Sequence, residues 1–355
     1  MDWIPGMVCE TCGGIDCTCV KCSVCKKRVR RRDSCLRCYQ CRSHHFVYNT
    51  KDFPHRKCCY MSEIDDATYE LNPLRRHLGV EVELEDFGYR LQRYPDGYVA
   101  LDYTMVHDGS VVGSAMELVT NKMIGDRYMV AMAELIRDIK GGGGKANSSC
   151  GYHCHVDAAD FGMDEIRRAI VLFKTIQMSL YGSLVDRSRA GSHGMQYSAP
   201  LKCDTRLLMA MDTKGEFSNW LHSWLYQATI PSRDSYDDDT LYKQALRDID
   251  AAFKKYKSTK YMNHARRMAL NFHSWMMRGT LEFRLKEGTT DPKDLLFWPL
   301  WCGWFVELCK QMSNSEVNSI IAIPKYDLLT LAERQVAVGM PKAVQQWVTE
   351  RVAGL

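Results

Sequence analysis

Three short segments of this chain place two polar, ligand-type residues at positions i and i+2, with one apolar residue between them. They are Glu81-Val82-Glu83, His153-Cys154-His155 and Glu282-Phe283-Arg284. Because side chains alternate between the two faces of a β-strand, each polar pair points to one face and its apolar neighbours to the other. Three such strands in one sheet would gather carboxylates, imidazoles and a guanidinium on the front face. Clustered carboxylates repel one another unless a cation binds them, so the pattern predicts a divalent metal site.

The cysteines divide the chain into two unlike parts. Of 16 Cys in 355 residues, 11 precede residue 60, and this same part carries more Lys and Arg than Asp and Glu. Residues 1–60 hold too few aliphatic side chains for a hydrophobic core, so we expect a small Cys-rich zinc-binding module there. A polar linker over residues 61–72 and a catalytic domain over residues 73–355 complete the predicted organisation.

The Cys spacing is typical of tetrahedral zinc sites with thiolate ligands. The strongest set has two C-x2-C pairs separated by nine residues: Cys22, Cys25, Cys35 and Cys38. A second zinc ion would use Cys9, Cys12, Cys17 and Cys19, with Cys41, His44 or His45 as substitutes. Disulfides, free thiols and an iron–sulfur cluster are the alternatives, and the spacing does not decide which ligands share an ion.

A basic run, Lys26–Arg32, lies inside the presumed zinc loop. Contacts with nucleic-acid phosphates, docking to a protein substrate and compensation of thiolate charge all explain it. The N-terminal residues lack a secretory signal pattern, so we expect a cytoplasmic protein. The longest apolar run, residues 295–306, has twelve residues. A membrane-spanning helix needs roughly 20, so the run predicts a buried helix and no membrane partner.

Hydrophobic periodicity predicts an α+β domain in which helices back an antiparallel or mixed sheet. The expected strands cover 78–84, 98–106, 115–119, 152–157 and a short segment around Glu282. The expected helices cover 126–140, 164–185, 241–256, 262–276, 293–312 and 340–352, and the stretch 186–240 is expected to be rich in loops.

The polar motifs, taken in order, resemble those of the amidoligase family, relatives of glutamine synthetase and glutamate–cysteine ligase. The matching motifs are Gly79-Val80-Glu81-Val82-Glu83, Asp108-Gly109-Ser110 with Glu117-Leu118, Gly151-Tyr152-His153-Cys154-His155-Val156, Asn271, and Glu282-Phe283-Arg284. The resemblance implies a glutamine synthetase-like curved sheet. It also implies that ATP activates a carboxylate as an acyl phosphate, which an amine then attacks, at a Mg²⁺ or Mn²⁺ site. Such proteins are frequent in phages, so a phage origin is an expectation by resemblance.

The resemblance also implies roles for single residues. The metal ligands would be Glu81, Glu83, Glu117, His153 and Glu282. His155 would contact an ATP phosphate, and Arg284 would stabilise the transferred phosphoryl group together with Glu282 in the catalytic centre. Asn271, Arg187 and Arg189 would contact the nucleotide or the carboxylate, and Asp108 would hold the amine.

The sequence leaves two other functions open, and it also allows an interpretation in which the polar pairs have no functional role. His153, His155 and a carboxylate would also suit a zinc-dependent hydrolase. A non-enzymatic scaffold that binds zinc and nucleic acid on a degenerate ligase fold is the second. The polar pairs are otherwise solvated strand faces with ordinary ion pairs. The substrates (small molecule, peptide or protein) and the oligomeric state are left open by the sequence.

Overall fold

The computed structural model describes residues 20–21, 28–29, 69–85, 87, 103–107, 115–190, 197–226, 238–241, 243–244, 247, 266–323 and 326–354. Near the N-terminus, β1 (Val20–Lys21) pairs antiparallel with β2 (Arg28–Val29). The cysteines of the expected zinc module and Asp108 lie outside the described residues.

One antiparallel sheet forms the centre of the domain, with the strand order β4-β5-β3-β6-β8-β7. The strands are β3 (Leu78–Glu85), β4 (Tyr103–His107), β5 (Ala115–Thr120), β6 (Tyr152–Asp157), β7 (Leu270–Asn271) and β8 (Thr280–Phe283). Five of them have four to eight residues and β7 has only two. Strands from four separate parts of the sequence are therefore neighbours in this sheet.

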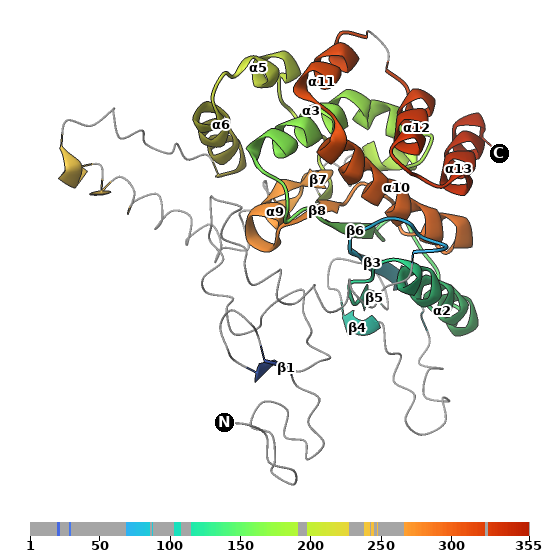
Figure 1. The fold of residues 1–355 in the computed structure, drawn as a ribbon. Coiled ribbons are helices and arrows are strands. Elements are labelled where there is room, and N and C mark those ends of the chain that lie inside the picture. Colours follow the sequence, from blue (N-terminus) through green and yellow to red (C-terminus); the bar gives the residue numbers. More distant parts are fainter. Residues whose placement is uncertain are drawn as a thin grey trace.

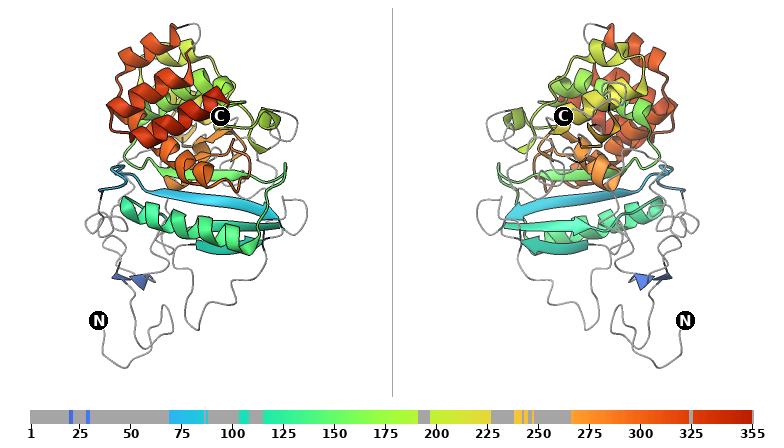
Figure 2. Two further views of the ribbon diagram at one scale, coloured as in Figure 1. Left: turned by 90° about the vertical axis from the view of Figure 1, so that its right-hand side faces the viewer. Right: turned by 90° about the vertical axis from the view of Figure 1, so that its left-hand side faces the viewer.

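Helices cover one face of this sheet, as Figures 1 and 2 show. The helices among the described residues are α2 (Asp126–Gly142), α3 (Met163–Leu180), α5 (Thr205–Ala210), α6 (Lys214–Tyr226), α9 (Phe272–Arg278), α10 (Pro292–Gln311), α11 (Asn314–Ile321), α12 (Leu328–Ala337) and α13 (Lys342–Ala353), with the 3-10 turn η4 (Arg187–Ala190). Helix α10 contacts β3 and β6 and also packs against α2, α3, α12 and α13. It is the central helix of the layer behind the sheet.

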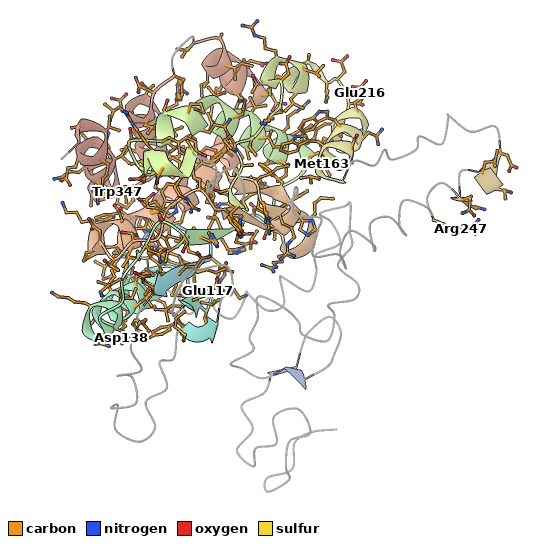
Figure 3. All side chains as sticks on the ribbon, turned by 180° about the vertical axis from the view of Figure 1, so that it is seen from behind. Glu117, Asp138, Met163, Glu216, Arg247 and Trp347 are labelled. Atoms are coloured by element: carbon orange, nitrogen blue, oxygen red, sulfur yellow. The ribbon has the colours of Figure 1, made fainter. Side chains whose placement is uncertain are left out.

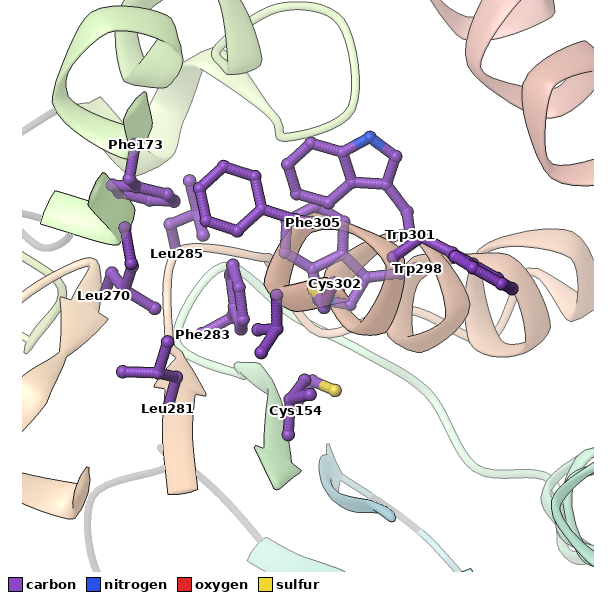
Figure 4. Close-up of a cluster of buried hydrophobic side chains, with 14 of the residues drawn as sticks. Cys154, Phe173, Leu270, Leu281, Phe283, Leu285, Trp298, Trp301, Cys302 and Phe305 are labelled. Carbon is purple, nitrogen blue, oxygen red and sulfur yellow. The ribbon is translucent and has the colours of Figure 1, made fainter. Parts of the chain in front are cut away.

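The back face of the sheet is apolar, as the alternation of the sequence predicts. Val80, Val82, Cys154 and Phe283 are at most 1% exposed. Figure 4 shows Phe283 among aromatic rings that come from α3 and α10. Its ring centroid lies 5.8 to 6.4 Å from those of Phe173, Phe305, Trp298 and Trp301. This packing fixes which way Glu282 and Arg284, on either side of Phe283, must point.

The apolar run 295–306 lies within α10, where most of its residues are buried, so the prediction of a buried helix is confirmed. Asp291 caps its N-terminus and accepts hydrogen bonds from the backbone N–H groups of Lys293 and Asp294. In the described part of the chain, no helix combines the length and the apolar character needed to cross a membrane.

The start of the described domain is tied down by one side chain. The Asp126 carboxylate accepts hydrogen bonds from the backbone N–H groups of Glu70, Leu71 and Asn72 at 2.8 to 3.2 Å. Residues 70–72, which the sequence places at the end of a linker, thus contact the N-terminus of α2.

Most predicted elements are confirmed within a few residues, namely the strands at 78–84, 115–119, 152–157 and Glu282 and the helices at 126–140, 293–312 and 340–352. The strand expected at 98–106 is described only from Tyr103 onward, and the helix expected at 241–256 falls almost wholly outside the described residues.

Other boundaries are wrong. The helix predicted over 164–185 ends at Leu180, because Tyr181 is extended and Gly182 takes a left-handed φ of 85°. The stretch 186–240, expected to be rich in loops, contains α5 and α6, and α11 and α12 had no predicted counterpart.

The helix predicted over 262–276 is also wrong, and this error concerns the site. Residues 270–271 form β7, and α9 begins only at Phe272. The Asn271 side chain caps α9 by accepting a hydrogen bond from Ser274 N, so Asn271 belongs to the sheet and not to a helix interior. A local strand pairing with β8 overrides the helical periodicity here.

We predict that Phe283→Ala lowers the free energy of unfolding by about 3–5 kcal/mol, because it empties the centre of the aromatic cluster. The control is Leu329→Ala, a 38% exposed residue at the start of α12, for which we expect a change within about 0.5 kcal/mol. Urea denaturation of both variants measures the difference. Equal effects would contradict the assigned back face.

Candidate functional site

Carboxylates and imidazoles from distant segments meet on the front face of the sheet. The register places Glu81 beside His153 and Glu282 beside His155. Glu81, His153 and Glu282 each offer one ligand atom, and these three atoms lie within 4.8 Å of one another. The predicted convergence of these three residues on one face is confirmed.

His153 lies between two acidic groups. Its Nδ1 is 3.3 Å from Glu81 Oε2, and its Nε2 is 3.9 Å from Glu83 Oε1. Glu117, on the neighbouring strand β5, faces Glu83 in the register, and Glu83, Glu117 and His153 form a second group of ligand atoms within 4.8 Å. Figure 3 shows Glu117 on the strand layer, well apart from Trp347 of α13. Two ligand groups therefore share His153.

The His155 ring is held by hydroxyl groups on one side. Its Nδ1 lies 3.2 Å from Thr280 Oγ1 and 3.4 Å from Ser274 Oγ, and these two hydroxyls are 2.9 Å apart. Its Nε2 faces Glu81 Oε1 at 3.3 Å and Glu282 Oε1 at 3.8 Å. This nitrogen is therefore directed into the acidic group, with Glu81 as its nearest partner.

Glu282 is the most firmly held carboxylate of the site. Asn271 Nδ2 donates a hydrogen bond to its Oε2 at 2.6 Å, and Arg284 Nη1 donates to its Oε1. Burial opposes ionisation of Glu282, but the charges of Arg284 and His155 outweigh burial and lower its pKa to about 2. Glu282 is therefore an anion throughout the physiological pH range.

The same balance acts on two other groups. Burial opposes the charge on Glu81, but His155 and His153 outweigh it and hold the pKa of Glu81 well below its ordinary value. Burial also opposes the charge on Arg284, yet Glu282 and Glu81 raise the pKa of Arg284. The surroundings of Glu81 and Glu282 thus favour the ionised form of both carboxylates despite their burial.

Glu83 is fixed by the backbone. Gly151 N donates a hydrogen bond to Glu83 Oε2 at 2.6 Å. A Cβ added at Gly151 would stand 2.7 Å from His153 Nε2 and 3.3 Å from Glu83 Oε2. Only glycine leaves space at this position for both side chains of the site.

Several residues of the site were missed by the sequence analysis. Glu85 continues the i, i+2 series of Glu81 and Glu83 on β3 and accepts a hydrogen bond from Asn147 Nδ2 at 2.6 Å. That alternation was a usable signal. Thr280 and Ser274 carried no signal in sequence, because their contact with His155 depends on how α9 follows β7.

Two other predicted residues, Arg189 and Arg187, lie in different surroundings. Arg189 is 4% exposed and donates hydrogen bonds to the carbonyl groups of Leu285 and Arg284, both at 3.3 Å. It therefore supports the end of β8. Arg187 lines a cavity of about 450 Å³ with Lys286, Asp294 and Arg351, and no metal-group residue lines this cavity.

The donor set fits a divalent cation. Four carboxylates and the His153 imidazole offer hard oxygen ligands with a nitrogen ligand beside them, a combination suited to Mn²⁺ or Mg²⁺. The His155 Nε2 borders this group, 3.3 Å from Glu81 Oε1.

Comparison with known families agrees with the motifs. A family model described as "putative amidoligase enzyme" matches residues 100–197 and 213–306, which is more than half of the chain. The matched ranges contain Glu117, His153, His155 and the segment from Asn271 to Arg284, whereas Glu81 and Glu83 precede them. No curated protein matches the chain.

We predict that Gly151→Ala weakens Mn²⁺ binding at least tenfold, because the added methyl group displaces His153 and Glu83. Gly141→Ala is the matched control, since nothing lies within 4 Å of the Cβ it adds. Titration with Mn²⁺, followed by electron paramagnetic resonance of the free ion, measures both affinities. Unchanged affinity in Gly151→Ala would show that this part of the face binds no metal.

Acid pH provides a second prediction. Glu282 has a pKa of about 2 in the folded protein against an ordinary 4.5, so its contribution to stability is complete above pH 4.5 and is lost as the pH falls through 2. The contribution is about 3 kcal/mol. In EDTA, urea denaturation of wild type and Glu282→Gln should show a stability difference that narrows by about this amount from pH 6 to pH 2. A constant difference would contradict it.

Proposed function

Because this chain belongs to the amidoligase family, we propose that it is an ATP-dependent ligase that joins a carboxylate to an amine. The observation that carries the proposal is the meeting of Glu81, His153 and Glu282, with Arg284 beside them, on one sheet face. Ordinary solvated ion pairs would not require three strands to direct ionised groups at one point.

A divalent cation would be held by Glu81, His153 and Glu282, or instead by Glu83, Glu117 and His153, because a neutral imidazole has one lone-pair nitrogen and serves one ion at a time. When bound, Mg²⁺ or Mn²⁺ would neutralise the phosphate charge of ATP. The resident carboxylates supply the negative charge that such an ion needs, and Asn271 and Gly151 fix two of those carboxylates in place.

His155 and Arg284 would act on the phosphate groups. The Nε2 of His155 points out of its hydroxyl-bound ring toward the acidic group, where an N–H would donate to a phosphate oxygen. Arg284 keeps one nitrogen on Glu282, so its planar guanidinium is already oriented when a phosphate approaches.

The proposed reaction has two steps. A substrate carboxylate oxygen attacks the γ-phosphorus of ATP and the bond to ADP breaks, which yields an acyl phosphate and ADP. An amine nitrogen then attacks the acyl carbon, phosphate leaves with its oxygen, and the amine gives up a proton. These residues position and neutralise charge, and none is a nucleophile. Asp108, proposed from resemblance to hold the amine, lies outside the described residues.

We also propose that the Cys-rich segment binds one or two Zn²⁺ ions and recruits a substrate. The support is the spacing of Cys22, Cys25, Cys35 and Cys38. The family match does not favour the zinc hydrolase. A zinc hydrolase would bind more zinc than the cysteines hold, and ATP would not affect it.

We predict that wild type releases ADP from ATP and Mg²⁺ in the presence of its carboxylate and amine. Glu81→Gln and Glu282→Gln should each reduce turnover at least a hundredfold, because each removes an anionic ligand. Glu333→Gln on α12, which removes an exposed carboxylate, should leave it unchanged. A coupled assay of ADP across panels of carboxylates and amines measures this. Full turnover in both site variants would refute the proposal.

A further inference from the structure

The front face changes from negative to positive next to the carboxylate cluster. Asn271 pairs with Glu282, and Arg284 N donates to Ala269 O at 2.8 Å, which makes Ala269 and Arg284 the next pair along the two segments. The segment 267–269 also pairs with Ala199: Ala199 N donates to Arg267 O at 2.7 Å, and Ala269 N donates to Ala199 O at 2.8 Å.

The position of Arg267 follows from its contact with Tyr197 and not from strand alternation, because the chain bends at Arg267 and Ala269. Ala269 and Asn271 pair with Arg284 and Glu282 on the front face. Met268 and Leu270 are 2% and 0% exposed, as expected for the apolar back.

Tyr197 joins the two guanidinium groups. The Arg267 Cζ lies over the Tyr197 ring, 4.8 Å from its centroid. The backbone carbonyl of Tyr197 accepts a hydrogen bond from Arg284 Nε at 3.4 Å. The two cations are thus held by one residue, at the border of the acidic group.

The two guanidinium groups differ in whether a carboxylate neutralises their charge. Arg284 forms an ion pair with Glu282. Arg267 is half-buried, and within the described ranges no carboxylate pairs with it; its one side-chain partner there is the Tyr197 ring. An aromatic face orients a guanidinium and leaves its N–H groups open to an anion. Arg267 is therefore a half-buried cation that has no acidic partner in these ranges and shares Tyr197 with Arg284, an arrangement suited to receive a negative group from outside.

We propose that Arg267, oriented by Tyr197 beside Arg284, is a binding residue for an oxyanion, either a phosphate group of a nucleotide or the carboxylate of a substrate. Which of the two it binds rests on the proposed function, whereas binding of an oxyanion does not. The alternative is a structural role in which Arg267 only packs on Tyr197. That role predicts a loss of stability with no effect on anion binding.

The test uses the full chain and isothermal titration calorimetry, both with Mg²⁺ and in EDTA. The probes are inorganic phosphate, a non-hydrolysable ATP analogue and glutarate. The variants are Arg267→Gln and Arg267→Lys, and the matched control is Arg266→Gln, which removes the same charge from the exposed neighbouring residue. Thermal unfolding of each variant establishes that it folds.

We expect Arg267→Gln to weaken at least one probe roughly tenfold or more, as for a lost charge-assisted hydrogen bond. Arg267→Lys should recover part of the affinity and Arg266→Gln should stay within about twofold of wild type. Loss of phosphate and nucleotide binding identifies a phosphate, and loss of glutarate binding alone identifies a carboxylate.

Equal affinities in Arg267→Gln and Arg266→Gln for all three probes would overturn the inference, as would a wild type that binds none of them. A failure of the proposed ligase function gives a different result from a failure of the Arg267 proposal. A wild type that does not bind Mg²⁺ or turn over ATP contradicts the ligase, while phosphate binding in EDTA still reports on Arg267.

Discussion

The mutual repulsion of carboxylates on one sheet face is the constraint on which the rest of this structure depends. Glu81, Glu83, Glu117 and Glu282 come from three strands and lie side by side. The protein offsets part of this repulsion with two imidazoles, Asn271 and Arg284. Arg284 and His155 lower the pKa of Glu282 so far that protonation cannot relieve the crowding near neutral pH. A bound cation would stabilise a face built in this way further.

The back of the sheet determines the geometry of the front. Phe283 is locked among Phe173, Trp298 and Phe305, so the residues on either side of it have one orientation available. Cys154 has the same relation to His153 and His155, since it is fully buried between them. The charges follow an order along the face, with acids at the centre and arginines toward β7. That order suits a ligand that carries both metal-bound phosphate and further negative charge.

Much of this arrangement could be predicted from sequence, because side chains alternate between the two faces of a strand with a period of two residues. The alternation in 78–85, 152–157 and 280–283 indicates which side chains share a face, and the structure brings those residues together. The identity of neighbouring strands could not be derived in the same way, since the pairing of β6 with β3 and β8 joins residues at least 70 positions apart.

Local patterns failed where tertiary contacts decide the conformation. The segment before Asn271 has a helical period, yet hydrogen bonds with Ala199 and Arg284 keep it extended. Arg267, Thr280 and Ser274 became site residues only through that change, so no sequence pattern identified them. Arg187, predicted to contact the nucleotide or the carboxylate, lines a cavity with Lys286, Asp294 and Arg351, and its role stays a prediction.

The central claim is that acids from distant parts of the chain bind a cation together, and anomalous X-ray diffraction from crystals soaked in Mn²⁺ tests it most directly. The account predicts an anomalous peak among the Glu81, His153 and Glu282 side chains, with electron density joining the ion to all three. Ordered side chains at this place with no peak, or with Mn²⁺ bound only elsewhere on the protein, would contradict it.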